Sequence, residues 1–197
     1  PSGETSSFRS NPLRLAEFTL SRKDPAYVGR AKEVHAVEVA REAGQCPCEA
    51  SAEVAAVYDA LQGKFGALDA KDIVLGSTIY ANKPGDGSAR EQAASCQRVL
   101  GGAANLAREY ATKRYRSNLI NWGMLPFLAP SAEDFQVGDY LFLPQVRDRV
   151  RDGAPVQASI VRGGKVVGEV SLQLGALTDD ERQILLDGCL INFYRKH

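Results

Sequence analysis

Hydrophobic residues recur along this chain at two spacings, one typical of helices and one typical of strands. In the first third, a polar opening is followed by apolar residues at helical spacing, which predict helices. Asp24-Pro25 marks one helix start, with an N-cap residue directly before a proline. A mostly apolar run then predicts a buried strand. In order, we expect an irregular segment 1–24, a helix from 25 that ends near 44, a loop 45–50, a helix 51–62 and a strand 73–79.

The middle of the chain joins a strand to a helix through a loop that contains glycine. Open α/β sheets bind their ligands at such a junction of strand, loop and helix N-terminus. A glycine and a proline, Gly123 and Pro126, mark the end of a second helix. The expected elements here are a helix from 88, a short strand near 103–107 and a helix across 110–121.

The last third is richer in strand patterns. Residues 139–143 predict one strand, and apolar arms on both sides of Gly163-Gly164 predict a hairpin. One face of the second arm is expected to be buried, because apolar and polar residues alternate along it. The apolar positions are Val170, Leu172 and Leu174.

A final helix is expected after the capping box of Thr178 and Glu181, with Ile184, Leu185 and Cys189 on its apolar side. The patterns together predict one α/β domain over residues 1–197 with a β-rich C-terminal end. The chain opens on Pro1 without a methionine, so we expect a piece of a longer protein.

Charge and hydropathy exclude some classes of partner. Lysine plus arginine and aspartate plus glutamate number 24 each, so the net charge is 0. This balance argues against nucleic acid or an acidic membrane surface as the main partner. No apolar run approaches the roughly 20 residues of a membrane helix.

The cysteines do not predict a metal site. Cys46 and Cys48 are separated by one residue, which is too close for an easy disulfide and is not a usual zinc spacing. Only two histidines are present, and they do not complete a ligand cluster. We expect reduced thiols in a cytoplasmic protein and no metal bound by this chain.

The most informative segment is a glycine-rich turn that leads into a helix start. Ser88 followed by Glu91 is a capping box, which places that start at Ser88. Gly85 and Gly87 let the backbone pass close to a ligand, and the first-turn N–H groups favour an anion. Arg90 adds a planar guanidinium that matches a carboxylate. A carboxylate-binding loop and a plain α/β domain with a well-capped helix both remain open.

Three segments resemble motifs of the aconitase family. The first, Gly85-x-Gly87-Ser88-Ala89-Arg90-Glu91-x-Ala93, is similar to G-x-G-S-S-R-E-H-A. The second, over 118–126, is similar to N-x-x-x-x-G-[LM]-L-P. A weaker third match, Pro1-Ser2-Gly3 with Phe8-Arg9-Ser10-Asn11, resembles a segment that carries another substrate-binding arginine. The main similarity covers residues 73–127.

The resemblance implies the C-terminal swivel domain of an aconitate hydratase, a three-layer swivelling β/β/α domain with a mixed sheet. The implied reaction interconverts citrate and isocitrate through cis-aconitate, as in the tricarboxylic acid cycle. Ser88 stands where the family has the serine that removes a proton from the carbon next to a carboxylate. Arg90 and Arg9 stand where arginines bind substrate carboxylates. A serine base requires a stabilised alkoxide, which helix N–H groups and a guanidinium supply.

The resemblance also implies a [4Fe–4S] cluster, which handles the departing hydroxide and takes its cysteine ligands from other domains. Cys46 and Cys48 match those ligands in neither place nor spacing. The expected partners are therefore the N-terminal cluster-bearing domains of the same protein and a di- or tricarboxylate substrate. Alone, this chain is predicted to be inactive.

Two residues depart from the family motif, and the first of them bears on the substrate. Ala89 occupies a substrate-contacting position but replaces the usual second serine, which removes a hydroxyl. Gln92 replaces the usual histidine. Two alternatives therefore stay open: the small subunit of an isopropylmalate isomerase-like dehydratase, and a non-catalytic carboxylate-binding module.

Overall fold

Two three-stranded sheets of different kinds organise the computed structural model, which describes residues 7, 8, 10–129 and 135–197. The parallel sheet has β2 at its centre and consists of β1 (Ser77–Ala81), β2 (Gly102–Ala107) and β3 (Leu125–Leu128). The antiparallel sheet has β5 at its centre and consists of β4 (Tyr140–Phe142), β5 (Val156–Arg162) and β6 (Lys165–Leu172). In place of the single mixed sheet expected from the resemblance, the described residues therefore form two sheets.

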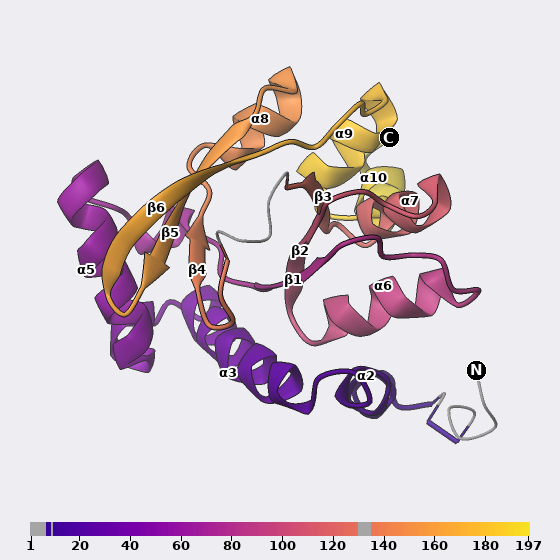
Figure 1. Ribbon diagram of the computed structural model, residues 1–197, viewed down its shortest axis with the longest axis horizontal. Coiled ribbons are helices and arrows are strands. Elements are labelled where there is room, and N and C mark those ends of the chain that lie inside the picture. The colour runs from indigo at the N-terminus through magenta and orange to yellow at the C-terminus, as the bar shows by residue number, and fades with distance from the viewer. Residues whose placement is uncertain (1–6, 9, 130–134) are drawn as a thin grey trace.

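Helices flank both sheets. In Figure 1 the antiparallel sheet lies beside α5, and the parallel sheet lies beside α6 and α7. The helices are α2 (Pro12–Ser21), α3 (Pro25–Glu42), α4 (Pro47–Ala50), α5 (Ala52–Phe65), the 3-10 helix η1 (Ala70–Asp72), α6 (Arg90–Val99), α7 (Lys113–Asn121), α8 (Val146–Asp152), α9 (Asp179–Asp187) and α10 (Leu190–Lys196). The α/β class predicted from the sequence is confirmed. None of the described helices combines the length and apolarity that a membrane crossing requires.

The polar opening of the chain is not irregular throughout. Asn11 accepts a hydrogen bond from the N–H of Arg14 and precedes Pro12, so it starts α2. Asp24 starts α3 in the same way, through the N–H of Tyr27. Both starts combine an N-cap acceptor with a proline whose missing N–H costs nothing at the first helical position.

The strand predicted over 73–79 begins later and is less buried than expected. The N–H of Leu75 donates to the carboxylate of Glu38 at 3.0 Å rather than to a strand, so pairing begins only at Ser77. β1 is an edge strand of the parallel sheet, and Val74, just before it, is 70% exposed. The prediction of a buried strand is therefore wrong, since no residue of β1 is buried.

Three further boundaries differ from the sequence-based expectation. The predicted loop 45–50 contains α4, which starts at Pro47. The predicted final helix is interrupted at Gly188, whose φ of +99° ends α9, and Cys189 becomes the N-cap of α10. The segment predicted only as a helix stop continues into β3, where an edge position accommodates Pro126 because no outward N–H is needed there.

The C-terminal hairpin and the capping box are confirmed. Gly163 and Gly164 have φ values of +57° and +73°, as a two-residue type I′ turn between paired Arg162 and Lys165 requires. The three alternating apolar residues are all buried, although the last of them, Leu174, lies just beyond the end of β6. The capping box of Thr178 and Glu181 opens α9 with both hydrogen bonds formed.

The central strand β2 connects two regions of packing. Leu106 belongs to a core cluster that also contains Phe127 of β3 and the inner residues of β5 and β6. The neighbouring Asn105 donates instead to the hydroxyl of Tyr115 on α7. Because successive strand residues point to opposite faces, β2 presents one face to the antiparallel sheet and the other to α7.

The close approach of two helix ends fixes the C-terminal part against the motif region. Gly123 follows α7 with a φ of +75°, and a Cβ on it would lie 1.7 Å from the carbonyl oxygen of Gly188. Only a residue without a side chain allows these two backbones to meet.

We expect Gly123→Ala to lower the free energy of unfolding by about 3 kcal/mol or more, because it adds both a backbone strain and a clash. Gly29→Ala is the matched control: Gly29 lies inside α3 with no atom near its added Cβ. That change should raise stability by about 0.5–1 kcal/mol. Urea unfolding of both variants checks the pair, and equal stability of Gly123→Ala and wild type would contradict the contact.

Candidate functional site

The glycine-rich motif forms the loop between β1 and α6. Ser88 and Ala89 are exposed in this loop, and Arg90, the first residue of α6, is half-buried. The loop places the serine hydroxyl and the guanidinium two residues apart at a helix N-terminus. Arg9, the second arginine expected from the resemblance, lies outside the described residues.

The predicted capping box of Ser88 and Glu91 is not formed. α6 starts one residue later than predicted, with Ala89 as its N-cap and no side-chain cap hydrogen bond. The carboxylate of Glu91 accepts from the indole N–H of Trp122 at 2.6 Å instead, so it does not reach back to the cap. Ser88 is therefore not used as a helix cap.

Asn118, the first residue of the second motif, binds the same first turn of α6. With its amide oriented so that donors meet acceptors, the nitrogen donates to Glu91 Oε2 and the oxygen accepts from the N–H of Glu91, both at 3.1 Å. Ala89 offers no side-chain acceptor to the remaining N–H groups of that turn. These N–H groups and the helix dipole favour an anion close to Ser88.

Hydrogen bonds to the connection between β2 and α7 hold the motif loop. The carbonyl oxygen of Gly85 accepts from Arg90 Nε at 3.1 Å and from Thr112 Oγ1 at 3.2 Å. The carbonyl of Pro84 accepts from the N–H of Ala111 at 2.9 Å. Two donors thus hold the loop at the carbonyl of Gly85, and a third holds it at the preceding carbonyl of Pro84.

The two glycines of the motif loop have different structural roles. A Cβ on Gly85 would lie 2.5 Å from the side chain of Tyr115, and the φ of Gly85 is +97°. Gly85 is therefore required by the packing of the protein itself. A Cβ on Gly87 would meet no protein atom within 4 Å, so Gly87 leaves space open beside Ser88.

Two phenols, of Tyr110 and Tyr115, form hydrogen bonds inside the fold, and Tyr115 packs against Gly85 of the motif loop. The hydroxyl of Tyr115 accepts from Asn105 Nδ2 at 3.0 Å, and the hydroxyl of Tyr110 donates to the carbonyl of Phe127 at 3.0 Å. Burial raises the pKa of Tyr110 and of Tyr115, so both phenols stay protonated at neutral pH. Their role is structural, because neither is exposed beside Ser88.

Sequence reasoning missed Thr112, Tyr115 and Asn105 as supports of the loop. Thr112 carried a usable signal, since a threonine directly before the helix 113–121 is a typical N-cap. The contacts of Tyr115 and Asn105 had no such signal, because they depend on the packing of α7 against β2.

The described residues do not fit an iron–sulfur cluster. They contain no group of three or more histidine, cysteine, aspartate or glutamate side chains placed to hold a metal ion. All four cysteines are free thiols, as predicted: Cys46 is exposed, Cys96 is buried, and Cys48 and Cys189 are half-buried. Burial and the neighbouring Cys46 raise the pKa of the Cys48 thiol.

Two cavities lie apart from the motif loop. The larger, of about 1590 Å³, has a mainly apolar lining from α3, α5 and both sheets, and contains neither Ser88 nor Arg90. We nevertheless place the candidate site on the loop, because its exposed hydroxyl, guanidinium and helix N–H groups suit a carboxylate. The size of a cavity alone does not provide groups that bind a carboxylate.

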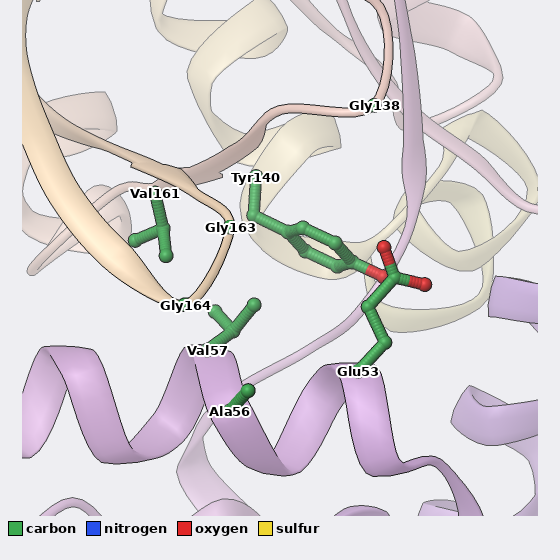
Figure 2. A pocket seen from close by; sticks show the side chains of 8 residues that line it. All are labelled: Glu53, Ala56, Val57, Gly138, Tyr140, Val161, Gly163 and Gly164. Atoms are coloured by element: carbon green, nitrogen blue, oxygen red, sulfur yellow. The ribbon is translucent and has the colours of Figure 1, made fainter.

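The smaller cavity, of about 210 Å³, lies between α5 and the turn of the β5–β6 hairpin (Figure 2). Figure 2 shows the carboxylate of Glu53 facing the hydroxyl of Tyr140. Burial first, and then Glu53, raise the pKa of Tyr140 to about 12, so the phenol stays protonated. The described residues that line this cavity include an acidic group and no cation, which does not suit an anionic substrate.

We expect Gly85→Ala to lower the free energy of unfolding by about 2 kcal/mol or more, since the added Cβ meets Tyr115 in a left-handed conformation. Gly87→Ala is the matched change in the same loop and should stay within about 0.5 kcal/mol of wild type. Thermal unfolding followed by circular dichroism separates the two. Equal losses at both positions would contradict the different roles of the two glycines.

Comparison with known proteins agrees with the motifs. Residues 49–132 match the profile of the aconitase C-terminal domain family. The homoaconitase small subunit of Thermus thermophilus is 29% identical over 119 residues, which cover 60% of this chain and 64% of that subunit. The matched part thus spans less than two thirds of this relative.

A solved structure also aligns with the chain. The 3-isopropylmalate dehydratase of Methanocaldococcus jannaschii superposes with a TM-score of 0.47 and 24% identity, covering 71% of this chain and 77% of that one. The family match contains the whole motif loop and the segment from Asn118 to Pro126. Residues 49–132 of this chain are thus similar to the aconitase C-terminal domain family.

Proposed function

We propose that this chain is the part of an aconitase-family hydro-lyase that carries the serine base and binds a substrate carboxylate, and that it works as a small subunit. The observation that carries this proposal is the loop that exposes Ser88 beside Arg90 at the start of α6. The similarity to a homoaconitase small subunit supports the small-subunit assignment over the aconitate hydratase domain that the motifs first suggest. A three-layer swivelling domain is part of the same proposal.

In the proposed reaction, Ser88 removes a proton from the carbon next to a carboxylate. A serine hydroxyl is a weak base unless its alkoxide is stabilised. The guanidinium of Arg90 and the first-turn N–H groups of α6 supply positive potential at that place. The hydroxyl is not occupied as a helix cap, which leaves it available for this step.

Substrate binding is assigned to arginine. Arg90 would hold one carboxylate of a hydroxy di- or tricarboxylate, and Arg9 is proposed to hold another. Ala89 lies between Ser88 and Arg90, and its side chain has no hydroxyl to offer to the substrate. Ala89 is therefore a candidate determinant of which hydroxy acid is accepted.

The remaining half of the site is assigned to a partner. Since the described residues offer no ligand set for a [4Fe–4S] cluster, a cluster in the assembled enzyme would be held by a separate cluster-bearing subunit or domain. In this proposal the chain supplies the base and the carboxylate-binding group, and its described residues include no metal-binding cluster to assist the departing hydroxide. We derive no step through the cluster from this chain.

In the assembled enzyme, we expect Ser88→Ala to lower kcat by about 100-fold or more with KM nearly unchanged, because the base acts in the transition state. Ser117→Ala is the matched control, since the Ser117 hydroxyl donates only to the carbonyl of Lys113 within α7. The measurement is steady-state hydration of cis-aconitate, cis-homoaconitate and isopropylmaleate. Full activity of Ser88→Ala would overturn the assignment of the base.

Arg90→Lys should raise KM by about 10-fold, because one ammonium does not replace a guanidinium on a carboxylate. Arg114→Lys, at an exposed position of α7, is the control and should change neither constant. The same assays report both variants.

The purified chain without a partner should show no hydration of the three substrates above background. Its mixture with the cluster-bearing partner should be active. Turnover by the chain alone would contradict the proposal that it holds half of an active site.

A further inference from the structure

We propose that Thr112 is a positioning residue for Arg90, and that it acts through the carbonyl oxygen of Gly85. This inference rests on the proposed function, because it concerns how the carboxylate-binding guanidinium is held. Thr112 lies outside the family's loop motif and precedes α7, 22 residues after Arg90 in the chain.

The hydroxyl of Thr112 forms two hydrogen bonds at once. It accepts from the N–H of Tyr115 at 3.2 Å, which caps α7, and it donates to the carbonyl of Gly85 at 3.2 Å. A threonine hydroxyl has one proton and two lone pairs, so both bonds fit its capacity. Through this one atom, the N-terminus of α7 is tied to the motif loop.

The carbonyl of Gly85 is shared between Thr112 and Arg90. Arg90 Nε donates to it at 3.1 Å, which occupies the Nε side of the guanidinium. A carboxylate can therefore pair with Arg90 only through the two terminal Nη atoms, in an end-on arrangement. The direction of that arrangement is set by where the Gly85 carbonyl points.

Gly85 cannot shift to follow Arg90, because its α-carbon packs against the side chain of Tyr115. Tyr115 is itself fixed, since its hydroxyl accepts from Asn105 on the central strand of the parallel sheet. Thr112 adds the hydrogen bond that orients the carbonyl above this packed position. Losing it leaves Arg90 as the sole side-chain donor to that carbonyl among the contacts of the described residues.

The test uses the assembled enzyme and three variants. Thr112→Val keeps the shape of the side chain and removes both hydrogen bonds, while Thr112→Ser retains the hydroxyl. We expect Thr112→Val to raise KM for the turned-over substrate by about 3- to 10-fold with kcat within about 2-fold, since the substrate carboxylate that Arg90 contacts keeps its charge in the ground state and the transition state alike. Thr112→Ser should restore both constants to within about 2-fold of wild type.

Thr178→Val controls for the loss of a helix cap. Thr178 caps α9 with its own hydroxyl and makes no contact with the motif loop in the hydrogen bonds of the described chain. This variant should lose stability as Thr112→Val does, without any rise in KM. A similar rise in KM for Thr112→Val and Thr178→Val would show that Thr112 acts only through stability and would overturn the inference.

Binding of tricarballylate, a tricarboxylate that cannot be dehydrated, gives a second measurement. Isothermal titration calorimetry should show its Kd raised by Thr112→Val as much as KM is raised. Ser88→Ala and Arg90→Lys in the same assays test the proposed function separately. If those two lose activity and affinity as expected but Thr112→Val does not, only the positioning role fails. If wild type neither binds nor turns over any of these carboxylates, both proposals fall.

Discussion

The packing of Gly85 on Tyr115 determines where every group of the motif loop lies. This contact needs a residue without a side chain. It therefore fixes the path of the loop between β1 and α6 against the ring of Tyr115. The hydrogen bonds of Arg90 and Thr112 then converge on the carbonyl that this course presents. The exposed part of the motif rests on a buried polar network that extends to β2, and that network supplies rigidity where chemistry needs fixed geometry.

Elements were predictable from the sequence where a local signal decides the outcome. Asp24 and Thr178 start helices as predicted, because their side chains bond N–H groups three residues away. Ser88 was expected to do the same and does not. The N–H of Glu91 donates to Asn118, and the carboxylate of Glu91 accepts from Trp122, 31 residues after Glu91. Here a tertiary contact overrides a local pattern, and no reading of the motif alone reveals it.

The candidate site was predictable to a similar extent. The motif predicts Ser88 and Arg90 as candidate site residues, and the strand–loop–helix junction predicted to carry them is present. It did not reveal that the Nε side of Arg90 is occupied by its own loop, because that depends on the fold of the loop over α7. The segment similar to the aconitase C-terminal domain family, residues 49–132, contains both groups, while their orientation depends on the packing of this chain.

The bridge between Leu128 and Gln173 has a consequence for the order of folding. Leu106 and Phe127 lie in the matched segment, but the strands that cover them, β5 and β6, come from residues 156–172. During synthesis the motif-bearing half leaves the ribosome first, with this apolar face uncovered. This face is covered only after residues 156–173 pair with it, and contacts between such distant parts of a chain form slowly. Until then the exposed apolar face favours assistance by a chaperone.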